Sequence, residues 1–334
     1  MKHINVALFV THKGCPHMCS FCNQKTISGF SKDVTKEDIQ SAATIALSKM
    51  SESDRGKGEI AFFGGSFTMI EREYMIYLLE SAQPYIQSGG FNGIRISTRP
   101  DGISDEICQI LKKYGVTAVE LGAQSLCDRV LSLNERGHTA QDVTNAMGLL
   151  KKYGFETGLQ MMTGLYGSKD EDSIETAKKI IELGPDTIRI YPTVVLENTR
   201  LAALYREGVY SPAGVEESAK LCAELIEMFE KANIKIIRVG LHSGGDVEKG
   251  FVAGAYHPAF KEICESKIYL KKALAALSDM EKGYYEITVS NREKSKMTGQ
   301  KRCNIDYLGN IGYSCKILGN PEMKKYEIRV RKIK

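Results

Sequence analysis

The chain has 334 residues, of which 43% are hydrophobic and 26% are charged. This composition is typical of a globular protein with a large core and gives no reason to expect disorder. No apolar stretch approaches the ~20 residues that span a bilayer, and the first apolar run is too short for a signal peptide, so we expect a cytoplasmic protein that does not insert into a membrane.

The net charge of +4 is unevenly distributed along the chain. Residues 281–334 hold thirteen lysines and arginines against six acidic residues, which gives +7 there and leaves −3 for residues 1–280. The basic character is therefore local. Nine cysteines without a secretory signal predict free thiols in a reducing compartment and not a disulfide framework.

Strand-like apolar runs alternate with amphipathic helical patterns over most of the chain. Six such units in a row predict an α/β fold with parallel strands, which either close toward a barrel or form a doubly wound open sheet. The expected strands are 4–10, 59–63, 93–97, 117–121, 156–161 and 187–191. The expected helices are 35–50, 71–86, 104–114, 140–153, 172–182 and 215–231.

Unusual polar residues and glycines occur where these strands end. In a barrel of parallel strands the active site lies in the loops at the carboxyl ends of the strands. We therefore expect one shared site built from these positions. They are the cysteines after the first strand, Gly64 and Gly65 after the second, Arg99 after the third, Glu120 and Gln124 on the fourth, Gln160 on the fifth and Tyr191 on the sixth.

Three cysteines, Cys15, Cys19 and Cys22, lie within eight residues of one another directly after the first strand. Soft thiolates select zinc, copper(I) or an iron–sulfur cluster. A structural zinc ion or a ferredoxin cluster takes four ligands, and the next cysteine is Cys108, so three thiolates on a four-iron cluster would leave one iron open. A Cys3His zinc site completed by His12 or His17 is the structural alternative.

The cysteine loop, with Phe21 before the third cysteine, resembles the cluster motif of the radical S-adenosylmethionine (SAM) superfamily. Gly64-Gly65-Ser66-Phe67 resembles the glycine-pair motif of that superfamily, which holds the SAM amine. Within the superfamily, the chain resembles the radical domain of the Elongator catalytic subunit, which modifies the wobble uridine of tRNA. The matching stretches are Thr98-Arg99-Pro100-Asp101, residues 119–125, Arg136-Gly137-His138-Thr139 and residues 190–195.

The chain departs from the Elongator pattern in two respects. Its first two cysteines are closer together, and Asn23-Gln24-Lys25 follows the third cysteine in place of Pro-Gly-Gly. We also expect no acetyltransferase domain, because too few residues follow the radical domain.

The resemblance implies a partial (β/α)6 TIM-like barrel whose Cys15, Cys19 and Cys22 hold a 4Fe-4S cluster. Reductive cleavage of SAM at that cluster would give a 5′-deoxyadenosyl radical that acts on a tRNA or RNA nucleoside, with a flavodoxin or ferredoxin as electron donor. The glycines would admit the SAM amine, Arg99 would pair with its carboxylate, and Phe21 would pack on adenine. The full set of expected SAM contacts is Phe21, Gly64, Gly65, Ser66, Phe67, Arg99, Glu120, Gln124, Gln160 and Tyr191.

Several of these residues have structural alternatives. Glu120 lies in an otherwise apolar strand and is a candidate for a buried ion pair with Arg95 or Arg189. A glycine pair after a strand often forms only a tight turn. Tyr191, which precedes a proline, is equally compatible with core packing.

The chain divides into a radical SAM barrel over 1–240, a covering loop and linking helix over 241–280, and a small basic α+β module over 281–334. In the module we expect strands at 284–290, 312–318 and 326–332 and a helix at 293–307. Its lysines and arginines predict salt-dependent binding to tRNA or another RNA. The turn at residues 298–302 resembles the backbone-clamping loop of KH domains but lacks the second glycine.

Two other functions remain open from the sequence. One is a radical SAM oxidoreductase of the coproporphyrinogen-oxidase-like branch acting on a small molecule. The other is a non-catalytic RNA-binding protein in which the cysteines hold structural zinc.

Overall fold

The computed structural model describes residues 5–10, 14–16, 18–23, 26, 32–241 and 245–333. His12, His17 and His242 lie outside these residues. Within them, no helix is both long and apolar enough to cross a membrane.

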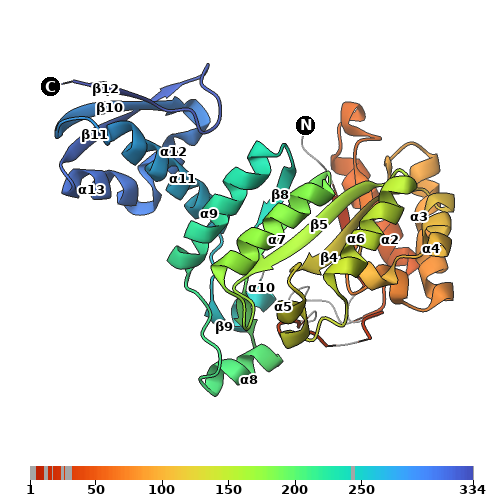
Figure 1. The fold of residues 1–334 in the computed structure, drawn as a ribbon. Coiled ribbons are helices and arrows are strands. Elements are labelled where there is room, and N and C mark those ends of the chain that lie inside the picture. The colour runs from red at the N-terminus through yellow and green to blue at the C-terminus, as the bar shows by residue number, and fades with distance from the viewer. Residues whose placement is uncertain are drawn as a thin grey trace.

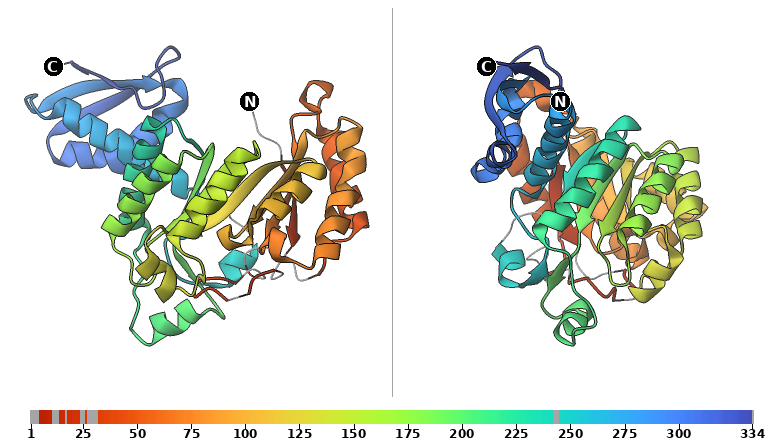
Figure 2. Two further views of the ribbon diagram at one scale, coloured as in Figure 1. Left: turned by 45° about the vertical axis from the view of Figure 1, so that its right-hand side comes forward. Right: turned by 60° about the vertical axis from the view of Figure 1, so that its left-hand side comes forward.

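Seven parallel strands form one curved sheet in the order β1-β2-β3-β4-β5-β6-β8, and helices cover its outer, convex face (Figures 1 and 2). The strands are β1 (Asn5–Val10), β2 (Glu59–Gly64), β3 (Gly93–Thr98), β4 (Val116–Gln124), β5 (Glu156–Thr163), β6 (Thr187–Pro192) and β8 (Lys235–Val239). The predicted α/β partial barrel is confirmed. The structure adds β8, a seventh strand that was not among the expected ones.

The helices follow their strands as the right-handed crossovers of parallel sheets require. They are α2 (Lys36–Lys49), α3 (Arg72–Gln87), α4 (Asp105–Lys113), α5 (Asp128–Leu133), α6 (Ala140–Lys152), α7 (Asp170–Leu183), α8 (Arg200–Arg206) and α9 (Val215–Lys231). Local signals fix several boundaries. At the start of α2 the Thr35 side chain accepts a hydrogen bond from the backbone amide of Asp38, and the Asp38 side chain accepts one from the backbone amide of Thr35. Thr139 and Asp142 form the same capping box at the start of α6.

Successive side chains of each strand point to opposite sides, so the sheet has two different faces. On the outer face, apolar side chains such as Ile60, Ile96, Leu121 and Ile190 pack against the helices in the main core. The inner face carries the alternate residues, many of which are polar. Polar side chains therefore gather inside the curve of the sheet, where the sequence analysis places the site.

A second hydrophobic core lies in the C-terminal part of the chain. Helices α11 (Phe260–Leu277), α12 (Lys294–Thr298) and α13 (Cys303–Asn310) pack on a three-stranded sheet of order β11-β10-β12. The strands are β10 (Gly283–Ser290), β11 (Tyr313–Asn320) and β12 (Arg329–Lys332). Helix α11 contributes Ile263 and Ile268 to the main core and Tyr269 and Leu277 to the second.

A short antiparallel ribbon of β7 (Val194–Leu196) and β9 (Phe251–Gly254) accompanies the helix α10 (Gly245–Lys249) near the carboxyl ends of the barrel strands (Figure 1). The division of the chain at residues 240 and 280 remains a prediction.

Candidate active site

The cysteine loop is anchored to the barrel through Ser20. This serine is fully buried between the second and third cysteines, and its hydroxyl donates to Oδ1 of Asn134 over 2.7 Å. Its backbone amide donates to the Asn134 carbonyl, and its carbonyl accepts from the amide of Leu201 over 2.7 Å. The loop is thereby held between the end of α5 and the start of α8.

Gly14 brings the cysteine loop against the loop that follows β2. Its φ is +73°, a conformation that favours glycine, and a Cβ there would lie 2.3 Å from the carbonyl oxygen of Ser66. The close approach places Sγ of Cys15 3.3 Å from Oγ of Ser66. Gly14 was not among the residues predicted for the site.

The glycine pair has a structural role at this junction. Gly64 has a φ of +114°, and a Cβ there would lie 2.9 Å from the carbonyl oxygen of Val10. The amide of Gly65 donates to the same oxygen over 2.8 Å. The pair therefore forms the turn by which the ends of β1 and β2 close on each other, and it also lines the cavity beside the cysteines.

A cavity of about 850 Å³ lies at the carboxyl ends of the strands. Its wall brings together most of the residues singled out from the sequence, namely Cys15, Cys19, Phe21, Cys22, Gly64, Gly65, Ser66, Arg99, Gln124 and Gln160. Three of the predicted residues lie elsewhere. Tyr191 lines an adjoining cavity, Phe67 is buried and stacked on Phe62, and Glu120 lies deeper in the barrel.

Two arginines border the cavity. Arg99 is held by Asp101 through hydrogen bonds of 2.9 and 2.8 Å, and its buried Nη1 has no hydrogen-bond partner among the described residues. Arg136 donates from Nη1 to Sγ of Cys19 over 3.0 Å and from Nη2 to the carbonyl of Gly122, while its buried Nε has no partner in the described residues. Arg136 belongs to a stretch that carried the family resemblance, but its part in the site was missed.

Gln124 ends β4 in the left-handed region, with a φ of +63°. A non-glycine residue rarely adopts this conformation, and such strain is often found at functional sites. The buried Oε1 of Gln124 lacks a partner within the described residues. Arg99, Gln124 and Arg136, which all line the cavity, thus each have one buried polar atom without a partner in the described residues.

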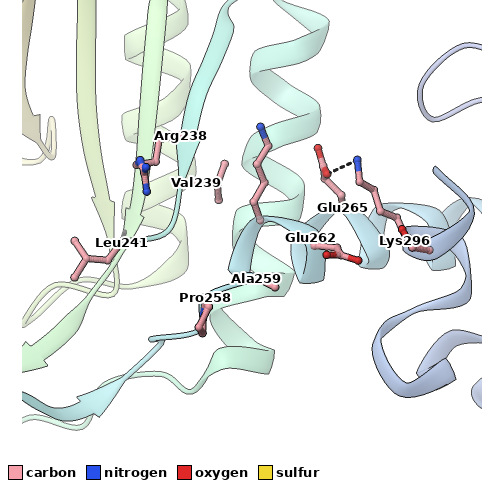
Figure 3. A pocket seen from close by; sticks show the side chains of 10 residues that line it. Arg238, Val239, Leu241, Pro258, Ala259, Glu262, Glu265 and Lys296 are labelled. Carbon is pink, nitrogen blue, oxygen red and sulfur yellow. Dashed lines mark ion pairs between the residues drawn. The ribbon is translucent and has the colours of Figure 1, made fainter. Parts of the chain in front are cut away.

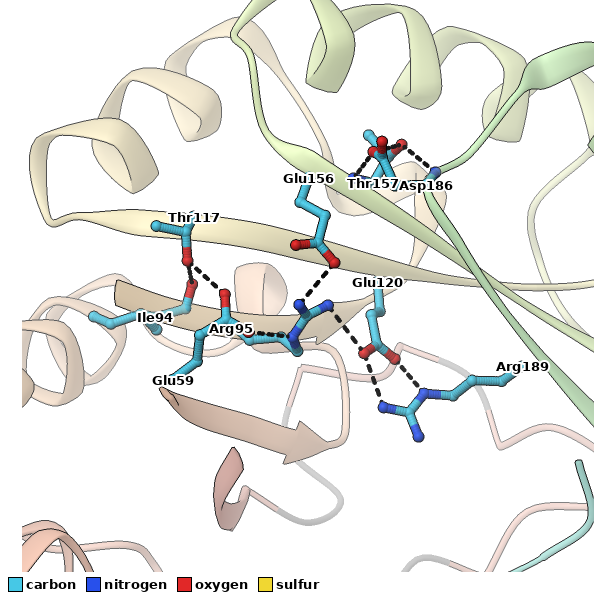
Figure 4. A network of polar contacts seen from close by, with 9 residues as sticks. All are labelled: Glu59, Ile94, Arg95, Thr117, Glu120, Glu156, Thr157, Asp186 and Arg189. Atoms are coloured by element: carbon cyan, nitrogen blue, oxygen red, sulfur yellow. Dashed lines mark hydrogen bonds and ion pairs between the residues drawn. The ribbon is translucent and has the colours of Figure 1, made fainter. Parts of the chain in front are cut away.

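Glu120 is the centre of a buried ion network on the inner face of the sheet (Figure 4). Arg189 donates to its two oxygens over 2.6 and 2.9 Å, and Nε2 of Gln160 donates over 3.1 Å. Arg95 lies 3.4 Å away and also pairs with Glu59 and Glu156. The structural alternative for Glu120, a buried ion pair, is confirmed. Its expected contact with SAM remains a prediction.

The second cavity, of about 450 Å³, adjoins the first inside the barrel. The two share wall residues that include Phe21, Gln124 and Gln160. The guanidinium of Arg189 lies over the Phe63 ring, 5.4 Å from its centroid. Burial raises the pKa of Tyr191, so its hydroxyl keeps its proton at neutral pH. The remaining wall is largely apolar, with Phe9, Met162, Val194 and Leu196.

A groove of about 570 Å³ separates β8 from the C-terminal helices (Figure 3). Arg238 and Leu241 line both this groove and the second cavity. On the side of the groove opposite β8, Lys296 of α12 pairs with Glu265 of α11 over 2.7 Å. The inner cavity and the C-terminal part of the chain are therefore close neighbours.

The donor set of the first cavity fits an iron–sulfur cluster with an organic ligand beside it. The three cysteines line one cavity, where soft thiolates suit iron and sulfide. The partnerless atoms of the two arginines and Gln124 suit a zwitterionic ligand with a carboxylate and hydroxyl groups.

Comparison with known families agrees with this site. The sequence profile of the radical SAM superfamily matches residues 9–180, and the profile of the radical SAM C-terminal domain matches residues 185–270. The chain belongs to the radical SAM superfamily, and the prediction of a radical SAM enzyme is confirmed. Membership implies a 4Fe-4S cluster and SAM binding.

The chain is also similar to individual proteins of known name. The chain is 30% identical to a tRNA uridine(34) acetyltransferase of Dehalococcoides mccartyi over 62% of its own length and 52% of that protein. It is 28% identical to human Elongator complex protein 3 over 52% of its length and 35% of that protein. The chain thus spans about half or less of these curated relatives. The fold matches that of an archaeal Elp3 from Methanocaldococcus infernus with residues 1–46 deleted, at a TM-score of 0.64 and 23% identity, over 81% of this chain and 63% of that one. The resemblance to the Elongator family is confirmed.

Proposed function

We propose that the protein cleaves SAM reductively at a 4Fe-4S cluster held by Cys15, Cys19 and Cys22. One observation carries the proposal: the three cysteines line the same cavity as the buried polar atoms of Arg99, Gln124 and Arg136 that lack partners. When bound, the cluster supplies the electron that converts SAM to methionine and a 5′-deoxyadenosyl radical.

The side chains around the cavity suggest how SAM is held. Arg136 and Arg99 each have two nitrogens occupied and one without a partner in the described residues, but Arg136 also contacts the sulfur of Cys19 directly. We therefore assign the SAM carboxylate chiefly to Arg136, with Nη1 of Arg99 as a second donor. Gln124 and Gln160 line both cavities, and we assign them to the ribose hydroxyls. Phe21, in the same wall, supplies an apolar face for adenine.

The second cavity is the place we propose for the reacting part of the substrate. Its apolar wall, with Arg189, Tyr191 and Arg238 as donors, suits a flat heterocycle with carbonyl oxygens. Relatives named tRNA uridine(34) acetyltransferase support a nucleoside of tRNA as that heterocycle. The basic C-terminal module would hold the RNA, and a flavodoxin or ferredoxin would deliver the electron.

Mass spectrometry of an anaerobic, dithionite-reduced reaction tests the chemistry without knowledge of the substrate. Reconstituted protein should contain about four irons per chain and should form 5′-deoxyadenosine from SAM. Cys19→Ala should form none, and addition of unmodified tRNA should raise the rate. A colourless protein that binds one zinc ion and leaves SAM intact would refute the proposal.

A further inference from the structure

The C-terminal sheet has one covered face and one open face. Tyr285, Ile287 and Val289 of β10 point toward α11–α13 and belong to the second core. Because side chains alternate along a strand, Tyr284, Glu286 and Thr288 point the other way. In Figures 1 and 2 the helices of this module lie on one side of the sheet only.

The open face is basic. The strand register places Glu286 beside Lys316 of β11 and Arg331 of β12, and it places Thr288 beside Arg329. The three strands thus present three cations and one carboxylate on this face. Arg331 pairs with Glu286 and Arg329 pairs with Glu327 over 2.9 Å, yet the two arginine side chains are 78% and 67% exposed. Both guanidinium groups remain available to a phosphate.

An aromatic ring lies on the same face. Tyr284, on the central strand, is 61% exposed, which is unusual for a large aromatic side chain in a sheet. Ile333, whose amide donates to the Tyr284 carbonyl, is 46% exposed beside it. Lys316 and Arg331 flank Glu286, the next residue of β10 on this face after Tyr284. An exposed ring with cations near it is the arrangement on which unpaired bases stack while their phosphates are neutralised.

We propose that this open sheet face, defined by Tyr284, Lys316, Arg329 and Arg331, binds unpaired nucleotides of an RNA. The inference deepens the proposed function, since it names the surface that holds the RNA whose nucleoside reacts in the barrel. The exposed ring favours single strands over duplex, because the bases of a duplex are already stacked on one another. The positive charge of the face complements the RNA backbone.

Fluorescence anisotropy with the reconstituted protein and a short labelled oligouridylate tests the surface. Tyr284→Ala should weaken binding by about tenfold, whereas Tyr284→Phe should bind like the wild type, because the stacking ring is kept. Lys316→Gln and Arg331→Gln should each reduce the slope of log affinity against log salt by about 0.7. A duplex RNA of equal length should bind more weakly.

Two variants serve as matched controls. Tyr307→Ala removes a tyrosine that is 48% exposed on α13, on the helical side of the module, and should leave binding unchanged. A double variant with Lys301→Glu and Arg302→Glu alters the turn before α13, also on that side. The proposal is overturned if Tyr284→Ala binds like the wild type, if Tyr307→Ala weakens binding equally, or if only the turn variant loses the RNA.

Formation of 5′-deoxyadenosine separates this inference from the proposed function. Tyr284→Ala should cleave SAM at the wild-type rate in the absence of RNA. Intact SAM cleavage without oligouridylate binding would refute the open-face site alone, and RNA binding without SAM cleavage would refute the proposed reaction alone.

Discussion

Arg136 donates a hydrogen bond to the sulfur of Cys19 across 117 residues of sequence, over 3.0 Å. A donor to a cluster sulfur stabilises the reduced, more negative state and raises the reduction potential. Arg136→Gln should therefore lower the potential of the reconstituted cluster, on the order of 60 mV, which corresponds to ~1.4 kcal/mol in a one-electron couple. An electron paramagnetic resonance titration measures the shift.

Arg129→Gln is the control for this change. Arg129 lies on α5, is half exposed and pairs with Asp172, so its loss should leave the potential where it is. Equal potentials in Arg136→Gln and wild-type protein would show that the contact with Cys19 has no influence on the cluster.

Asn134 should be needed to keep the cysteine loop in place. Asn134→Ala removes the acceptor of the Ser20 hydroxyl and two donated hydrogen bonds, to the carbonyls of Val130 and Tyr166. The buried groups left without partners should lower the free energy of unfolding by about 1–3 kcal/mol and reduce the iron bound after reconstitution. Iron analysis and urea denaturation check both effects. Full iron content together with unchanged stability would contradict the anchoring role.

Removal of the Glu120 carboxylate should destabilise the barrel. Glu120→Ala leaves Arg189 without its carboxylate partner and the Arg95 side chain, which is 2% exposed, with one partner fewer. Breaking a buried ion network costs about 3–5 kcal/mol, and Glu120→Gln should cost less because Gln160 and Arg189 keep an acceptor. Denaturant titration measures the loss. Glu106→Ala removes one partner of an exposed ion pair with Arg72 and should leave the free energy of unfolding unchanged. If Glu120→Ala also left it unchanged, the buried network would add no stability.

His138 should make the stability depend on pH. Burial, and then the charges of Arg136 and Arg99, lower its pKa to about 4, and Nε2 lies 3.3 Å from the carbonyl of Ala123. Between pH 6.5 and 4 the unfolded chain therefore binds a proton that the folded protein does not, and stability falls as the pH falls. His138→Gln should remove as much as about 3 kcal/mol of this loss. Unfolding curves of the two proteins at several pH values provide the test; parallel pH profiles would contradict it.

Gly14 should tolerate no side chain. Gly14→Ala forces a Cβ against the Ser66 carbonyl in a left-handed backbone and should separate the cysteine loop from the glycine turn, with loss of iron binding. Gly148→Ala is the matched change, since a Cβ there meets nothing within 4 Å inside α6, and it should be neutral or stabilising. Normal cluster assembly in Gly14→Ala would show that this close approach is dispensable.

The sequence predicted those parts of the fold that depend on local signals. The start of α2 follows from the capping pair Thr35 and Asp38, and the six central strands follow from buried apolar runs. Strand β8 was not predicted, although Ile236, Ile237 and Val239 make it as apolar as β6. It is a short strand at the edge of the sheet, and most of its side chains are half-exposed.

The site was predictable as a set of strand ends, but its contacts were not. The cysteines and the glycine pair carry their own spacing signals, whereas the role of Arg136 depends on a contact with a residue far away in the sequence. Glu120 had two interpretations because the choice depends on Arg189 and Gln160, which come from other strands. It also depends on Gly158, where a Cβ would lie 2.9 Å from Cγ of Glu120.

Helix α11 is one continuous helix that belongs to both cores. Its first half packs in the main core, and its second half packs in the second core. Loosening either core would pull on the same backbone, so the two should melt together in one cooperative transition. A cut in the turn after Leu277 would strip the second core of Tyr269 and Leu277. The C-terminal segment should therefore unfold when severed from the barrel, while α11 would stay with the barrel and expose Tyr269 and Leu277 to solvent.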